Sequence, residues 1–243
     1  MKFFILGDSW GVGEWALEGQ KFILVPDTGL DYHLRQLGHT VTNISASAAG
    51  NFGQLRHTYW TLKENSDYDY IIWFHTESLR DIEEILIKDP KEGQRYFPNF
   101  NMNNFEAGLD YLDFENYKYA QTIADEYHIP FILIGGQSPV NSTITQFSFA
   151  QYIIHSWLAE LLNLKFVPPK NTLLSWDKIK RILNHYKINE KEFIINNIDQ
   201  LDKAKVIEDL ALKSPLFPDH THPSGECFKT LAQRLVNMIS SCQ

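Results

Sequence analysis

The chain has 243 residues, of which 44% are hydrophobic and 21% are charged, a balance typical of globular proteins. It carries 30 acidic and 22 basic residues, which give a formal net charge of −8 at pH 7. An acidic chain without a basic run is a poor candidate for binding nucleic acid or an anionic membrane, and no apolar run approaches the ~20 residues of a membrane span.

Short apolar segments alternate with helical patterns along most of the chain. Continuous apolar runs predict buried strands at residues 3–6, 70–74 and 131–134. Residues 40–44 are predicted as a further strand and residues 164–167 as a fifth. Apolar residues at helical spacing predict helices at residues 32–37, 54–62, 105–127 and 147–162. Such alternation is typical of a parallel sheet covered on both faces, so we expect an α/β fold with about five parallel strands.

Residues 168–214 depart from this rhythm. Pro168 and Pro169 open the segment, and two charged amphipathic stretches follow. We expect a helical insertion within a single domain that spans residues 1–243. The insertion is either added bulk, a lid over the site, or the contact through which a homo-oligomer forms.

The two cysteines and the N-terminal residues indicate the cellular compartment of the protein. Cys227 and Cys242 are 15 positions apart, which on one helix corresponds to ~22 Å, whereas a disulfide requires Cα atoms within ~7 Å. We therefore expect free thiols and a reducing compartment. The apolar run at residues 3–6 is too short for a signal peptide, so we expect a cytoplasmic protein.

The first predicted strand is followed by Gly7-Asp8-Ser9. Functional groups gather at the carboxyl ends of parallel strands, and a serine at a strand-to-helix turn is a candidate nucleophile because the helix N-terminus stabilises developing negative charge. A phosphate-binding loop is the alternative. It is disfavoured because the glycine spacing fits no phosphate motif, no lysine follows, and Asp8 would repel a phosphate.

A serine nucleophile needs a base, and the segment 218–223 near the C-terminus offers one. Asp219 and His222 are three residues apart, so one turn of chain brings both side chains to one side. The carboxylate would then hold Nδ1–H of His222 and leave Nε2 facing Ser9. His220 and His222 also form an H-x-H pair, but no further ligand cluster is evident, and we expect neither a metal nor a cofactor.

Together these motifs resemble the SGNH (GDSL-type) hydrolase superfamily of esterases and lipases. The resemblance rests on Gly7-Asp8-Ser9 after an N-terminal strand and Asp219-His220-Thr221-His222 before the last helix, and it covers about residues 1–90, 130–137 and 215–240. It implies a flavodoxin-like, three-layer α/β/α fold. It also implies Ser9 as the nucleophile, His222 as the general base and Asp219 as the residue that orients the imidazole.

The resemblance further implies an oxyanion hole near the end of the second strand. The backbone N–H groups of Gly50 and Ser9 would be two of its donors. The small residues around Gly50 would let backbone approach the ligand closely. Asn51 follows Gly50 and belongs either to this site or to the cap of the next helix.

After the third strand the chain departs from the family pattern. The family places a donating Asn here, whereas this chain reads His75-Thr76-Glu77-Ser78, with Glu77 at the Asn position. A carboxylate does not donate unless protonated, and its charge opposes an oxyanion. Three alternatives remain: Thr76 or His75 supplies the missing hydrogen-bond donor, Glu77 is protonated and donates, or the oxyanion hole has only two donors. We expect Glu77 at the mouth of the Ser9 site, where it either faces the oxyanion or is turned to solvent or held by an arginine such as Arg80.

These features predict a serine hydrolase that cleaves a carboxylic ester or an O-acetyl carbohydrate through an acyl-enzyme. The polar rim at residues 75–78 and the lack of a long apolar lid favour short acyl groups. The expected partner is a small-molecule or carbohydrate ester, with no nucleic acid and no membrane. The alternative is a non-catalytic or weakly active binding module on the same fold, which the departure from the family pattern at Glu77 favours.

Overall fold

The computed structural model describes residues 1–19, 21–101, 105–170 and 176–241. Its centre is a five-stranded sheet in which every neighbouring pair is parallel. The strands, in spatial order, are β4 (Thr40–Asn43), β1 (Lys2–Leu6), β5 (Tyr70–His75), β6 (Phe131–Gly135) and β7 (Ala150–Ile154). This is a flavodoxin-like order, which reverses between β1 and β5. The predicted α/β fold with about five parallel strands is confirmed.

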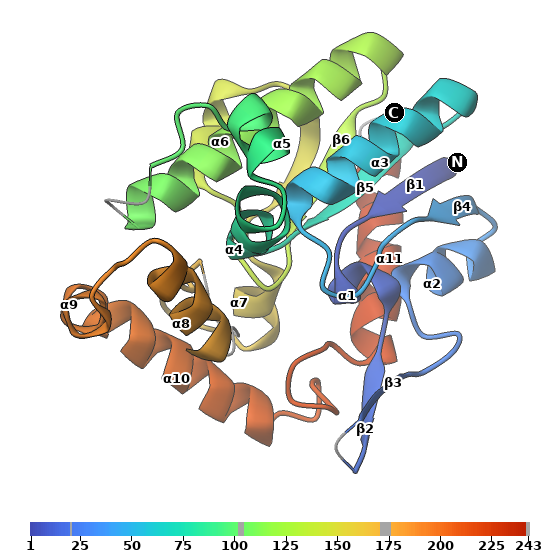
Figure 1. Ribbon diagram of the computed structural model, residues 1–243. Coiled ribbons are helices and arrows are strands. Elements are labelled where there is room, and N and C mark those ends of the chain that lie inside the picture. Colours follow the sequence, from blue (N-terminus) through green and yellow to red (C-terminus); the bar gives the residue numbers. More distant parts are fainter. Residues whose placement is uncertain (20, 102–104, 171–175, 242–243) are drawn as a thin grey trace.

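Helices cover both faces of the sheet (Figure 1). The helices on one face are α2 (Leu30–Gln36), α7 (Trp157–Leu161) and α11 (Gly225–Ser240). The helices on the other face are α3 (Asn51–Glu64) and α6 (Phe105–Tyr127). Side chains alternate along β1, so that Phe3 and Ile5 join the first core while Phe4 and Leu6 join the second. Burial on both faces explains why these strands are continuous apolar runs.

The remaining elements are short or lie at the carboxyl edge of the sheet. Those before α6 are α1 (Ser9–Val12), β2 (Trp15–Glu18), β3 (Lys21–Leu24), α4 (Leu79–Asp81), the π-helical η1 (Ile82–Ile87) and α5 (Pro90–Tyr96). Those after β6 are the 3-10 turn η2 (Ser142–Gln146), α8 (Trp176–His185), α9 (Glu190–Asn196) and α10 (Ile198–Lys213). Strands β2 and β3 form an antiparallel hairpin that extends away from the main sheet (Figure 1).

The fifth strand is β7, so the predicted strand at 164–167 and most of the predicted helix at 147–162 were wrong. Tyr152, Ile153 and Ile154 have high strand propensity, and they extend the sheet beyond β6. The helix begins only after Ser156, whose hydroxyl caps α7 by accepting the Ala159 N–H at 3.2 Å. The apolar residues of this stretch also fit a helical spacing, which concealed the strand.

The segment predicted as an insertion is largely helical and packs at two places. Ile182 of α8 and Phe193 of α9 join a third apolar cluster with residues of α4, η1 and α6. Ile207 and Ala211 of α10 join the core that contains α11. Cys227 is a buried free thiol, and Cys242 lies outside the described residues. No helix in the described ranges is long and apolar enough to cross a membrane.

Gly7 makes the turn that carries the chain from β1 to the site. Its φ is +151°, and a Cβ at this position would lie 2.7 Å from Cβ of Phe74. We expect Gly7→Ala to lower the free energy of unfolding by roughly 2–4 kcal/mol, measured by urea denaturation. Gly38→Ala is the control, since Gly38 also has a positive φ, of +85°, but no atom lies within 4 Å of its added Cβ. Equal losses in both variants would show that the contact with Phe74 does not matter.

Candidate active site

Ser9 lies at the first position of α1, directly after β1, at the carboxyl edge of the sheet where the strand order reverses. Asp8 caps this short helix by accepting the Trp10 N–H at 3.0 Å. The cap orients the turn, and the Ser9 side chain is almost completely buried. Asp8 therefore positions the serine.

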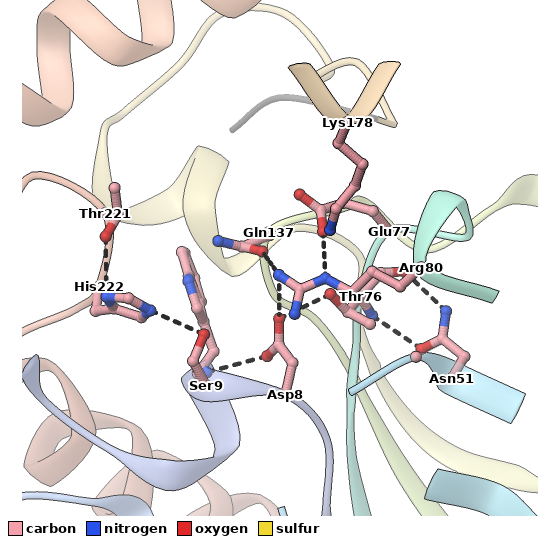
Figure 2. A network of polar contacts seen from close by, with 12 residues as sticks. Asp8, Ser9, Asn51, Thr76, Glu77, Arg80, Gln137, Lys178, Thr221 and His222 are labelled. Atoms are coloured by element: carbon pink, nitrogen blue, oxygen red, sulfur yellow. Dashed lines mark hydrogen bonds and ion pairs between the residues drawn. The ribbon is translucent and has the colours of Figure 1, made fainter. Parts of the chain in front are cut away.

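His222 reaches Ser9 from the other end of the chain (Figure 2). Its Nε2 lies 2.8 Å from Oγ of Ser9, and its Nδ1 lies 2.5 Å from Oδ2 of Asp219. The second oxygen of Asp219 accepts the backbone N–H groups of His222 and Thr221 at 2.7 and 2.9 Å. A carboxylate at Nδ1 places the proton there and leaves Nε2 as the acceptor for the serine hydroxyl. The structure thus brings Ser9, His222 and Asp219 into one chain of hydrogen bonds.

The charge state of Asp219 follows from these contacts. Burial alone raises the pKa of the carboxyl, but the hydrogen bond and charge of His222, together with the Thr221 and His222 N–H groups, outweigh it. The net effect is a pKa below the ordinary value of an Asp side chain. Asp219 therefore stays ionised at neutral pH.

A second polar network lies on the side of Ser9 away from His222 (Figure 2). Its centre is Arg80, whose Nε donates to Glu77 at 2.6 Å and whose Nη2 donates to Oε1 of Gln137 at 2.6 Å. The same Nη2 lies 3.3 Å from Oδ2 of Asp8, which also accepts the Thr76 hydroxyl at 2.7 Å. Glu77 is therefore held by Arg80, one of the two positions expected for it from the sequence.

The network buries two carboxylates around one guanidinium. Burial lowers the pKa of Arg80, but the charges of Glu77 and Asp8 outweigh it, so that the pKa is raised above its ordinary value. Arg80 is permanently charged and offsets one of the two carboxylate charges beside Ser9. The ion pair with Arg80 reduces the repulsion that the Glu77 carboxylate would exert on a developing oxyanion.

Gly50, the expected second donor of an oxyanion hole, is engaged elsewhere. It is the N-cap of α3, and its N–H donates to Oε2 of Glu84 at 3.1 Å. The Phe52 N–H in the same turn donates to Asp81 at 2.9 Å. Two carboxylates that follow β5 thus accept the N–H groups at the start of α3. The Gly50 N–H must break its hydrogen bond with Glu84 before it can donate to a substrate.

Asn51 and Thr76 hold the start of α3 against the end of β5. The Asn51 amide accepts the Thr76 N–H at 3.0 Å and donates to the Thr76 carbonyl at 2.8 Å (Figure 2). The Thr76 hydroxyl hydrogen is directed to Asp8. Both side chains are therefore committed to shaping the site.

His75 points to the face of the sheet that α6 covers. Its ring packs against Trp73 and Tyr117, with centroids at 5.5 and 5.6 Å, and its Nε2 lies 3.3 Å from Asp113 of α6. The structure thus places His75 apart from the Ser9–His222 pair, whereas Thr76 hydrogen-bonds Asp8 and Glu77 is linked to Asp8 through Arg80.

Gln137 lies in the segment 135–138, one of the strand ends at which the sequence predicts functional groups, but the sequence assigns it no role. It follows β6 and is nearly buried, and its Oε1 is fixed by Arg80. Figure 2 shows its amide nitrogen turned to the side on which Ser9 and His222 lie. Its place after a strand that ends in Gly135-Gly136 was the available signal, because strand ends converge on one edge of the sheet.

Asp81, which caps α3 beside the site, links stability to pH. Burial raises the pKa of its carboxyl to about 7, although the Phe52 N–H and Asn116 amide lower it. Between the ordinary Asp pKa and 7, the folded chain holds a proton that the unfolded chain has lost, so stability falls as pH rises through this window. Asp81→Asn mimics the protonated carboxyl. We expect its free energy of unfolding, relative to that of the wild type, to increase by on the order of 2 kcal/mol as the pH rises from 4 to 8. Chemical denaturation at several pH values measures this difference, and a pH-independent difference would contradict the assignment.

Comparison with family models and with curated proteins finds no match. Among solved structures, the psychrotrophic esterase EstA from Pseudoalteromonas sp. is similar at a TM-score of 0.45 and 14% identity, over 99% of this chain and 97% of that one. The acetyl xylan esterase AlAXEase is similar at 0.40 and 11% identity, over 98% and 100% of the two chains. A catalytic mutant of Axe2, an acetylxylan esterase from Geobacillus stearothermophilus, is similar at 0.39 and 14%, over 97% and 92%. Similarity at these TM-scores and identities does not indicate which reaction this chain catalyses. Only its own side chains can indicate that chemistry.

Proposed function

We propose that this protein is a serine esterase of the SGNH type. The single observation that supports this function best is the chain of hydrogen bonds from Ser9 through His222 to Asp219, at 2.8 and 2.5 Å. A serine hydroxyl activated in this way attacks acyl carbonyls.

The reaction follows from the proton positions. Oγ of Ser9 attacks the ester carbonyl while its proton passes to Nε2 of His222, and Asp219 stabilises the resulting imidazolium. The tetrahedral intermediate collapses when His222 returns the proton to the departing alcohol. Water then attacks the acyl-Ser9 ester with His222 again as the base, which releases the carboxylic acid and restores Ser9.

For the oxyanion we propose the Ser9 N–H and the amide of Gln137 as donors. The first position of a helix has an N–H without a partner inside the helix, and this group lies next to the nucleophile. Arg80 fixes Oε1 of Gln137, so the amide N–H₂ faces away from Arg80. The Gln137 amide would then fill the role that the family gives to the Asn at the position of Glu77.

The second candidate function is a weakly active or non-catalytic binding module on the same fold. The contact that favours it is the one between the Gly50 N–H and Glu84, because it occupies a donor that an active hole would use. A fluorophosphonate probe distinguishes the two functions. An esterase takes up the probe on Ser9 and hydrolyses p-nitrophenyl esters, preferring short acyl chains, whereas a binding module does neither.

A further inference from the structure

The hairpin of β2 and β3 has one face made entirely of apolar side chains. Paired residues of an antiparallel hairpin share a face, and successive residues alternate between faces. The pairs Trp15–Leu24 and Leu17–Phe22 therefore lie on one face, which we name the apolar hairpin face. The opposite face carries the remaining pairs, Ala16–Ile23 and Glu18–Lys21.

The apolar hairpin face is fixed to the candidate active site. The indole N–H of Trp15 donates to the Ser9 carbonyl at 3.1 Å. The rings of Trp15 and Phe22 pack against the His222 imidazole, with centroids at 5.5 and 6.0 Å. The face continues outward from the imidazole, yet Leu17, Phe22 and Leu24 are 45%, 52% and 42% exposed. An exposed apolar surface continuous with a histidine of a hydrolytic site is suited to contact the substrate.

The position of this face relative to Ser9 indicates which part of the substrate it contacts. His222 must deliver its proton to the departing alcohol, so the alcohol lies on the His222 side of Ser9. The acyl group and the oxyanion lie toward the opposite side, which is closed by Asp8, Arg80 and Gln137 (Figure 2). The two sides of Ser9 thus differ, with an open apolar surface toward the alcohol and a buried polar network toward the acyl group.

We infer that the apolar hairpin face is a leaving-group subsite, and that the substrates are esters of a short acyl group with an apolar alcohol. This inference rests on the proposed function. The face offers aromatic and aliphatic side chains and no hydrogen-bonding group apart from the Trp15 N–H, which is already donated to Ser9. It therefore selects an alkyl or aryl alcohol over a hydroxyl-rich one, whose polar groups would be desolvated without partners.

The test compares two isomeric esters, hexyl acetate and ethyl hexanoate, which carry the same atoms with the long chain on opposite sides of the carbonyl. We expect the wild type to prefer hexyl acetate by kcat/KM. Phe22→Ser and Leu17→Ser should each lower this preference by about 10-fold, as for the loss of apolar contact in a specificity pocket. The matched control is Ile23→Ser, which removes an apolar side chain of 42% exposure from the opposite face of the same hairpin and should keep the preference.

Each alternative gives a different result. A wild type without a preference for hexyl acetate, or a preference that Phe22→Ser and Leu17→Ser leave intact, overturns the subsite. Variants that instead lose sedimentation with phosphatidylcholine vesicles, or lose a dimer in light scattering, would assign the face to a lipid surface or a second copy. Fluorophosphonate labelling of Ser9 and hydrolysis of p-nitrophenyl acetate are measured alongside. If both are absent, the proposed function fails; if both are present, only the isomer comparison decides the subsite.

Discussion

Ser9→Ala is expected to reduce kcat/KM for p-nitrophenyl acetate by ~10⁴-fold or more, because the variant has no oxygen to attack the carbonyl and His222 has no proton to accept. The same substitution should abolish labelling by a fluorophosphonate, measured by intact-protein mass. Thermal stability should change little, since only the hydroxyl that contacts His222 is removed.

The control for this variant is Ser47→Ala, which removes the hydroxyl of an exposed serine in the loop after β4. It should be labelled and active like the wild type. Label that persists in Ser9→Ala would place the nucleophile elsewhere and refute the proposed reaction. Loss of labelling with retained activity would instead mean that ester hydrolysis in the assay comes from another source.

Gln137→Glu is expected to lower kcat by about 10²–10³-fold with a small change in KM. The variant keeps an oxygen that accepts from Arg80 Nη2, so the network at Arg80 is preserved, but it loses the amide N–H that we assign to the oxyanion. An interaction made mainly in the transition state affects kcat rather than KM. Steady-state kinetics on short-chain esters separates the two parameters.

The charge-matched control is Gln146→Glu, on an exposed residue of η2, which should leave both parameters unchanged. An unchanged kcat in Gln137→Glu would move the donor role to another group. The Gly50 N–H is then the next candidate, and Glu84→Gln would be expected to raise kcat by weakening the hydrogen bond that holds it.

The central sheet follows from the sequence because burial on both faces leaves a strong local signal. Each run such as Tyr70-Ile71-Ile72-Trp73-Phe74 is apolar without interruption, and the helix predicted at 105–127 matches α6. Strand β7 is harder to predict, because it lies at the edge of the sheet and its apolar residues also fit a helix. The hairpin of β2 and β3 gave no periodic signal, since apolar residues occupy one face and part of the other.

The candidate site also has one part that can be predicted from the sequence and one part that cannot. Gly7-Asp8-Ser9 and the segment 219–222 are local motifs, and each could be read without knowledge of the fold. The network around Arg80 depends on side chains from three strand ends, which no spacing in the sequence connects. Glu77 departs from the family pattern, which marked this position as one to explain. The partner of Glu77 and the role that we propose for Gln137 could be identified only from the three-dimensional packing.

The contact between Ser9 and His222 joins residues that are 213 positions apart. During synthesis Ser9 emerges well before His222, so the serine has no base until this later segment has followed. The base arrives when α11 docks, where the Gly225 N–H is bound by Glu14 at 2.5 Å and Phe228 enters the core. In the proposed reaction the serine therefore becomes competent only when α11 has docked, and detachment of this helix would separate the serine from its base.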